Sequence, residues 1–212
     1  SEYKRWLELI GEMNANLIRV YTIHPPEFYE ALFDYNQNHN QPLYLLHGVW
    51  LEEEALAASS TVFNSELTTD FETEIKDVID IVHGQAIIKA KSGYASGVYS
   101  KDISDYVLGY ILGIEWDPYL VDRTNKLNKA DFNGQYFKTD QAEPFEIWLA
   151  KRMETAVDYE QEVYNKQRSI SFTNWVTTDA IETKTDANEP EDSQRLASIN
   201  ADHIKKQSDF AA

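Results

Sequence analysis

The 212-residue sequence contains no cysteine, and it is poor in basic residues. Without thiols the chain forms no disulfides, offers no thiolate metal ligands and has no cysteine nucleophile. Its 19 Lys and Arg residues stand against 36 Asp and Glu residues, so the formal net charge is −17. This charge argues against nucleic acids and anionic membranes as partners, because both are themselves negatively charged.

Several familiar patterns are also missing. No apolar run approaches the roughly 20 residues of a membrane-spanning helix, so we expect no membrane insertion by this segment. The Gly-x-Gly-x-x-Gly, Walker, Gly-x-Ser-x-Gly and His-Glu-x-x-His motifs do not occur in the sequence. We therefore expect no nucleotide or other cofactor, no serine nucleophile of the elbow type and no metal site.

Two hydrophobic periods alternate along the chain. Apolar residues at three- and four-residue spacings predict helices, whereas short runs of β-branched and aromatic residues predict buried strands. The predicted helices cover residues 3–13, 27–36, 67–82 and 144–163, and the predicted strands cover residues 16–23, 42–51, 106–116 and 168–175. Residues 85–104 and 122–142 are predicted as loops, and residues 191–204 as a last helical piece.

This alternation predicts an α/β protein with a parallel sheet. Two closures are plausible, a parallel (β/α) barrel of TIM type or an open doubly wound sheet. A complete barrel takes about 250 residues and eight strands, whereas four clear strands are predicted here. We therefore expect residues 1–212 to form one incomplete barrel. Exposed sheet edges would favour a dimer or contact with the rest of a parent chain.

Polar and aromatic side chains gather at the predicted carboxyl ends of the strands, where parallel α/β folds bind their ligands. The candidates are Arg19, Tyr21 and His24 on the first strand, His47, Trp50 and Glu52 on the second, Glu115 and Trp116 on the third, and Asn174 and Trp175 on the fourth. Aromatic faces pack against sugar rings, and fixed polar groups pair with hydroxyls. The set predicts a carbohydrate-binding cleft.

Glu115 is the candidate catalytic residue. It follows a mostly apolar run and precedes Trp116, so we expect its carboxyl to be partly desolvated. Desolvation favours the protonated form, which suits a general acid. The alternative is a structural ion pair between Glu115 and Arg19.

The other candidates also have structural alternatives. Trp50, Trp116 and Trp175 would either stack on sugars or pack at the rim of the fold. His47 would either bond to a sugar hydroxyl or a catalytic carboxylate, or be a buried histidine satisfied by the backbone. The acidic stretch 179–192 would either bind calcium or form a solvated loop, and its spacing lacks the Asp-x-Asp-x-Asp-Gly pattern.

Four phrases carry a family resemblance: Asn14-Ala-Asn-Leu-Ile-Arg-Val-Tyr21, Leu45-Leu-His-Gly-Val-Trp50, Gly109-Tyr-Ile-Leu-Gly-Ile-Glu-Trp116 and Ser171-Phe-Thr-Asn-Trp175. Together they resemble the TIM-barrel catalytic domain of retaining β-glycosidases, most closely bacterial barrel domains of the glycoside hydrolase family 2 type. The resemblance spans roughly residues 1–204. It implies that the four strands are the second to the fifth of the barrel, that Glu115 is the acid/base, and that Arg19 matches an arginine common on the second strand.

The resemblance implies a glycoside hydrolase or transglycosidase that acts on β-linked glycans, often outside the cytoplasm. Its retaining mechanism needs two carboxyl groups about 5 Å apart. Ile114 stands where the family usually has Asn, and no stretch after residue 175 has the pattern of a seventh strand ending in Glu. We therefore expect the nucleophile outside this chain. The alternatives are a non-catalytic carbohydrate-binding or scaffolding barrel, and a metal-dependent hydrolase that uses His24, His47 and Glu115.

Overall fold

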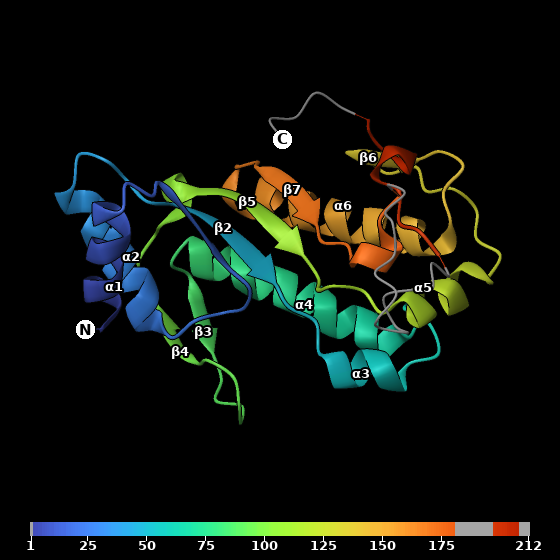
Figure 1. Cartoon of the computed structure of the whole chain (residues 1–212), viewed down its shortest axis with the longest axis horizontal. Helices are drawn as coiled ribbons and strands as arrows, with labels where there is room; N and C mark the ends of the chain where they lie inside the picture. The colour runs from blue at the N-terminus through green and yellow to red at the C-terminus, as the bar shows by residue number, and fades with distance from the viewer. Residues whose placement is uncertain (1, 181–196, 208–212) are drawn as a thin grey trace.

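The computed structural model describes residues 2–180 and 197–207, and it has the alternating α/β organisation predicted from the sequence (Figure 1). The helices are α1 (Glu2–Glu12), α2 (Pro26–Asn38), α3 (Glu53–Ala58), α4 (Ser65–Val82), α5 (Pro118–Asn125) and α6 (Pro144–Tyr164). The strands are β1 (Leu17–Val20), β2 (Tyr44–Val49), β3 (Ala86–Ile88), β4 (Gly97–Tyr99), β5 (Val107–Leu112), β6 (Phe137–Thr139), β7 (Ser169–Phe172) and β8 (Ile204–Lys206). Short 3₁₀ turns cover Ser104–Tyr106, Val176–Thr178 and Ala201–His203.

One parallel sheet contains the four strands predicted from the sequence, in the order β1-β2-β5-β7. Each strand is shorter than its predicted range, because the flanking residues leave the ladder where the chain turns toward a helix. The register places His47 of β2 opposite Val20 of β1 and Tyr110 of β5. Every new strand is added on the same side of the preceding one.

Helices α2 and α6 contact the same face of this sheet. Paired residues of neighbouring strands project to the same side, so His47 and Tyr110 share a face. His47 bonds to Tyr29 of α2, and Tyr110 bonds to Glu160 of α6. Right-handed crossovers between strands that are added in one direction place their helices in this way.

The opposite face of the sheet is partly exposed. Leu17 of β1 is 42% exposed, and Leu108 of β5 is 46% exposed. A register shift between Leu45 and Leu46 leaves Leu108 outside the pairing of β5 with β2. Within the described residues β1 and β7 are the outer strands, so the sheet is open there.

The covered face buries the hydrophobic core. The apolar positions of α4 recur at helical spacing and are buried: Leu67, Phe71, Ile75, Val78, Ile79 and Val82. Phe71 stacks on Trp148 of α6, with 5.6 Å between the ring centroids. The indole Nε1 of Trp148 donates to Thr68 Oγ1, so this large side chain is buried without leaving its donor unpaired.

A buried ionic network joins α6 to the sheet and to the end of α4. Glu160 Oε1 accepts hydrogen bonds from His83 Nε2 at 2.8 Å, Tyr110 Oη at 2.9 Å and Arg168 Nε at 2.8 Å. Burial acts to raise the pKa of Glu160, but the bond from His83 and the charge of Arg168 outweigh it and lower the pKa. The carboxylate therefore stays charged and holds three chain segments together.

Three segments differ from the sequence prediction. Residues 85–104 contain an antiparallel hairpin of β3 and β4, in which Ile87 faces Val98. Residues 122–142 contain the end of α5 and the strand β6. The helix predicted over residues 191–204 is wrong for its described part, because β8 pairs with β6 and Asn200 accepts a bond from the Asp202 backbone in a local turn. Residues 191–196 of that prediction lie outside the described residues.

Among the helices that the structure describes, none combines the length and the apolar character needed to cross a bilayer. The longest of them, α6, has 21 residues, but charged side chains recur along it. Its sides that face the core carry Phe145, Trp148 and Leu149, which are buried in the fold. These three apolar residues of α6 therefore belong to the hydrophobic core.

Candidate functional site

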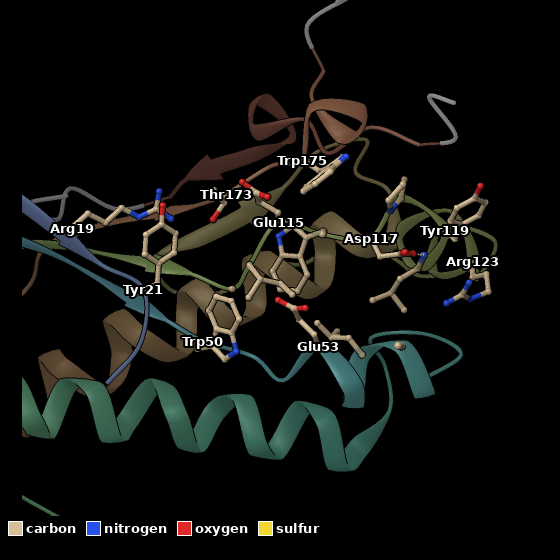
Figure 2. Close-up of a pocket in the computed structure, with 17 residues that line it drawn as sticks. Arg19, Tyr21, Trp50, Glu53, Glu115, Asp117, Tyr119, Arg123, Thr173 and Trp175 are labelled. Atoms are coloured by element: carbon tan, nitrogen blue, oxygen red, sulfur yellow. Dashed lines mark hydrogen bonds between the residues drawn. The ribbon is translucent and has the colours of Figure 1, made fainter. Parts of the chain in front are cut away.

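A pocket of about 740 Å³ lies at the carboxyl ends of all four parallel strands (Figure 2). Arg19 and Tyr21 come from β1, Trp50 from the end of β2, Glu115 from the end of β5, and Thr173 and Trp175 from the end of β7. Figure 2 shows Arg19 and Tyr21 at one end of the pocket, Tyr119 and Arg123 at the other, and Glu115 between them. The parallel register brings these residues together although up to 156 positions separate Arg19 from Trp175 in the chain.

Gly113 shapes the floor of the pocket directly after β5. Its φ of 79° lies in the left-handed region, which favours glycine. A Cβ on Gly113 would lie 2.0 Å from the Trp116 ring. The chain turns here because glycine permits both the positive φ and the close approach of the indole.

Glu115 is exposed and lines the pocket. The sequence predicted a partly desolvated carboxyl, and this prediction is wrong, because Glu115 is exposed among the described residues. The turn at Gly113 places its side chain outside the core. The alternative of an ion pair with Arg19 is not found either among the ion pairs of the described residues. Instead the Arg19 guanidinium lies 4.3 Å from the centroid of the Tyr21 ring.

Trp116 is a core residue rather than an exposed stacking platform. Its side chain is fully buried and makes edge-on contacts with Phe145 and Trp148, at centroid distances of 5.2 and 5.8 Å. The structure thus corrects the prediction that Trp116 stacks on a sugar like the other tryptophans. It still borders the pocket, and its Nε1 is buried without a hydrogen-bond partner.

Trp50 and Trp175 lie where the sequence placed them, at the ends of β2 and β7. Both side chains are half-buried, so part of each ring borders the pocket. Tyr21 is more open, with 57% of its surface exposed. These three rings, which come from different strands, give the pocket aromatic surface on more than one side (Figure 2).

His47 is buried beneath the sheet and does not line the pocket. Its Nδ1 donates to the Gly48 carbonyl at 2.7 Å, and its Nε2 accepts from the Tyr29 hydroxyl at 2.8 Å. Burial lowers the pKa of His47 to about 4, so the ring is neutral near pH 7. The alternative of a satisfied core histidine is therefore the correct one, and the predicted role in substrate binding is not supported.

Asn174 joins the end of β7 to the later segment of the chain. Its Nδ2 donates to the Ile199 carbonyl at 3.1 Å, and the residue does not line the pocket. Its Oδ1 is buried and unpaired. The sequence predicted a contact with substrate, whereas the structure shows a contact within the protein for the amide nitrogen.

Unsatisfied polar atoms concentrate at this edge of the sheet. Within the described residues, four of the five buried side-chain atoms that lack a partner are Trp116 Nε1, Thr173 Oγ1, Asn174 Oδ1 and Thr177 Oγ1. A buried polar group without a partner costs roughly 1–3 kcal/mol. Native proteins tolerate few such groups, and a cluster of them next to a pocket is typical of a binding site.

Several residues of the pocket were not predicted as site residues, and three of them carry charged or aromatic side chains on helices. Glu53 comes from the first turn of α3, and Tyr119 and Arg123 come from α5. Glu53 begins α3 and Tyr119 is the second residue of α5, so a search that included the first turns of these helices would have found both, whereas Arg123 lies a further turn along α5. Glu52, which was considered from the sequence, lines a neighbouring cavity instead.

No group of three or more His, Asp or Glu side chains is placed to hold a metal ion among the residues that the structure describes. His47 is buried on the helix side, while Glu115 is exposed at the pocket. The structure therefore does not assemble the metal-binding set of His24, His47 and Glu115. The acidic stretch 179–192 lies largely outside the described residues.

The chain matches no family model, no curated protein and no solved structure. Its function is therefore inferred from three properties of the chain itself. These are the strand order, the composition of the pocket and the four sequence phrases that end at the pocket.

Proposed function

We propose that this chain is part of a TIM-type (β/α) barrel that hydrolyses or transfers β-linked glycosides, with Glu115 as the acid/base residue. The consecutive strand order supports a barrel, because a doubly wound sheet reverses direction and places helices on both faces. The cover of one face by α2 and α6 supports the same arrangement. In such barrels the catalytic residues lie at the carboxyl ends of the strands.

The observation that carries the proposal is the pocket at this edge, which combines the exposed Glu115 with half-buried tryptophans from two other strands. Trp50 and Trp175 would pack against the apolar faces of sugar rings. Glu115 would donate a proton to the leaving glycosidic oxygen, and it would later accept a proton from the attacking water. Bound substrate would cover the exposed carboxyl and supply the desolvation that this role requires.

A retaining mechanism needs a second carboxylate about 5 Å from the first. Asp117 also borders the pocket, but its Oδ1 accepts from the Leu120 backbone and caps α5. Glu53 is the remaining carboxylate of the lining, in the first turn of α3. The family resemblance places the nucleophile at the end of another strand, so in the proposed mechanism Glu53 binds hydroxyls and the nucleophile comes from outside this chain.

The test compares Glu115→Gln with Glu30→Gln, an exposed change on α2 far from the pocket. The assay uses the complete parent protein of the proposed barrel, which supplies the nucleophile. Release of the chromophore from a panel of aryl β-glycosides measures turnover in that parent and in both variants made in it. Loss of a general acid typically costs about 10²–10⁴-fold, so Glu115→Gln should be nearly inactive and Glu30→Gln should equal the parent. Equal turnover in all three proteins would exclude Glu115 as the acid/base.

A second candidate is a non-catalytic carbohydrate-binding or scaffolding barrel. The exposure of Glu115 favours it, as does Ile114 at the position where the family usually has Asn. This candidate predicts glycan binding without turnover. Calorimetric titration of oligosaccharides that the protein does not hydrolyse would distinguish it from the enzyme.

The proposed function also indicates which partners the protein would have. The ligand would be a carbohydrate, and the negative net charge still argues against nucleic acids. The partly exposed sheet face and the outer strands β1 and β7 would contact a second copy or the rest of a parent chain. Glycans of the cell exterior would place the protein outside the cytoplasm.

A further inference from the structure

A second cavity, of about 1200 Å³, adjoins the proposed catalytic pocket. Trp50 lines both cavities, so its side chain lies at the boundary between them. The far wall of the second cavity is the hairpin of β3 and β4 with its connecting loop, which carries Lys89, Lys91 and Tyr94. A chain of sugars that enters the first cavity would therefore continue past Trp50 into the second.

Among the charged groups that line this second cavity, carboxylates outnumber ammonium groups. Asp70, Glu74 and Asp77 lie four and then three residues apart on α4, which places them on one stripe of the helix. Glu52 and Glu54 add two more from the other side of the cavity. Against these five carboxylates the lining contains two ammonium groups, Lys89 and Lys91.

The negative charge of the stripe on α4 is only partly offset within the described residues, where the charge of Lys91 acts on Glu74. The ion pairs found among the described residues include none of Asp70, Glu74 and Asp77. The Lys91 ammonium lies over the Tyr94 ring, 3.9 Å from its centroid. Burial, and then the charge of Asp77, raise the pKa of Glu74 to about 7. Like charges at this helical spacing destabilise a helix. The stripe therefore destabilises α4 unless a bound cation offsets the repulsion.

The arrangement does not suit a bare metal ion. Among the described residues no three His, Asp or Glu groups converge closely enough to hold one. The carboxylates are instead spread over the cavity wall, next to the aromatic rings of Trp50 and Tyr94. Spread carboxylates beside aromatic rings suit an extended ligand that carries amino groups on a ring with an apolar face.

We propose that the second cavity is a sugar-binding subsite that takes a β-linked amino sugar with a free amine, held by Glu74 and its neighbours on α4. This inference rests on the proposed function, because it treats the second cavity as the continuation of the glycan site. The amine donates to the carboxylates of the stripe, while Trp50 and Tyr94 contact the ring. Glucose and N-acetylglucosamine lack the positive charge, so they bind less tightly.

The experiment measures binding of three β-1,4-linked tetrasaccharides, made of glucosamine, N-acetylglucosamine or glucose, by isothermal titration calorimetry. The Glu115→Gln protein is used as the background so that no ligand is hydrolysed. We expect the glucosamine tetramer to bind at least about tenfold more tightly than the other two, and added salt to reduce the difference.

Three further changes locate the effect. Glu74→Gln should remove most of the preference for the amine, and the carboxamide relieves repulsion on α4, so the fold should persist. Lys91→Met should strengthen binding of the glucosamine tetramer, because it removes a competing cation. Glu162→Gln, an exposed change on α6, is the matched control and should leave all three affinities unchanged.

The outcomes separate this proposal from the proposed function. Equal affinity for all three tetrasaccharides, or a preference that Glu74→Gln does not change, would overturn the amino-sugar subsite even if aryl glycosides are hydrolysed. Amine-dependent binding that requires Glu74 in a protein that hydrolyses no glycoside would support the subsite, while the catalytic role of Glu115 would fail.

Discussion

The Tyr29 hydroxyl donates to His47 Nε2 across 2.8 Å, and this bond joins α2 to the centre of the parallel sheet. The same hydroxyl accepts from the His24 backbone amide at 3.2 Å. His47 in turn donates from Nδ1 to the Gly48 carbonyl. The chain of bonds fixes the neutral tautomer of His47 and anchors the end of β2, which leads into Trp50 of the pocket.

Removal of this hydroxyl should destabilise the protein. In Tyr29→Phe the buried Nε2 of His47 loses its donor, at a cost of about 1–3 kcal/mol. Urea denaturation followed by circular dichroism measures the free energy of unfolding. Tyr3→Phe is the control, since no hydrogen bond of the Tyr3 hydroxyl is found among the described residues. Equal losses in the two variants would contradict the role of the Tyr29–His47 bond.

The lowered pKa of His47 predicts a dependence of stability on pH. The folded protein holds His47 neutral until about pH 4, whereas the unfolded chain binds a proton near the usual pKa of 6.5. The unfolded state therefore gains protons first, and the His47 contribution to stability falls as the pH falls from 7 to 5, by about 2 kcal/mol.

Glu74 acts in the opposite direction over this interval, because its pKa is raised to about 7 and the folded state binds its proton first. The measurement is therefore a comparison of the parent with His47→Asn. Urea titrations at pH 7, 6 and 5 should show a smaller loss of stability in the variant. Parallel pH profiles for the two proteins would rule out the contribution of His47.

The ionic network below the sheet predicts a large effect of Glu160→Gln. The change leaves the buried Arg168 guanidinium without a charged partner, and only a neutral carboxamide oxygen remains to accept the three bonds that Oε1 accepts. Breaking a buried pair by removing one partner costs about 3–5 kcal/mol. Glu162→Gln, an exposed change two residues further along α6, should cost less than about 0.5 kcal/mol. Thermal and urea unfolding of both variants check the difference.

The aromatic rings of the pocket predict weaker substrate binding after truncation. Trp50→Ala and Trp175→Ala should each weaken glycan affinity about tenfold, because each removes a face for stacking. Trp6→Ala, which alters a 44% exposed tryptophan on α1 away from the pocket, is the control. Quenching of tryptophan fluorescence by an oligosaccharide gives the affinities. Unchanged affinity in both pocket variants would remove these rings from the site.

The parallel sheet could be predicted from the sequence because its strands are buried. Runs such as residues 106–116 are short and almost continuously apolar, and between helices this pattern predicts a buried parallel strand. The hairpin of β3 and β4 and the strand β8 could not be predicted, because their residues are mixed in polarity and depend on a partner strand for their conformation.

The sequence predicted the location of the pocket, at the carboxyl ends of the strands, better than it predicted which side chains line it. Arg19, Tyr21, Trp50, Glu115 and Trp175 reach the pocket because the ends of parallel strands meet at one edge. Trp116 and His47 were misassigned for a common reason, since a strand end has two sides and the sequence does not show which side a given residue takes there. Glu53 was missed because it lies beyond the strand end, as the first residue of α3.

The sequence by itself determined the alternation of the four parallel strands with helices and the edge of the sheet where their carboxyl ends meet, because hydrophobic periodicity and chain handedness act locally. Only the tertiary structure decided that Glu115 is exposed, that Trp116 and His47 are buried, and that Trp50 borders two cavities. These outcomes depend on the turn at Gly113 and on contacts between segments far apart in the chain. The burial of a single side chain is set by the partners that the complete fold brings to it.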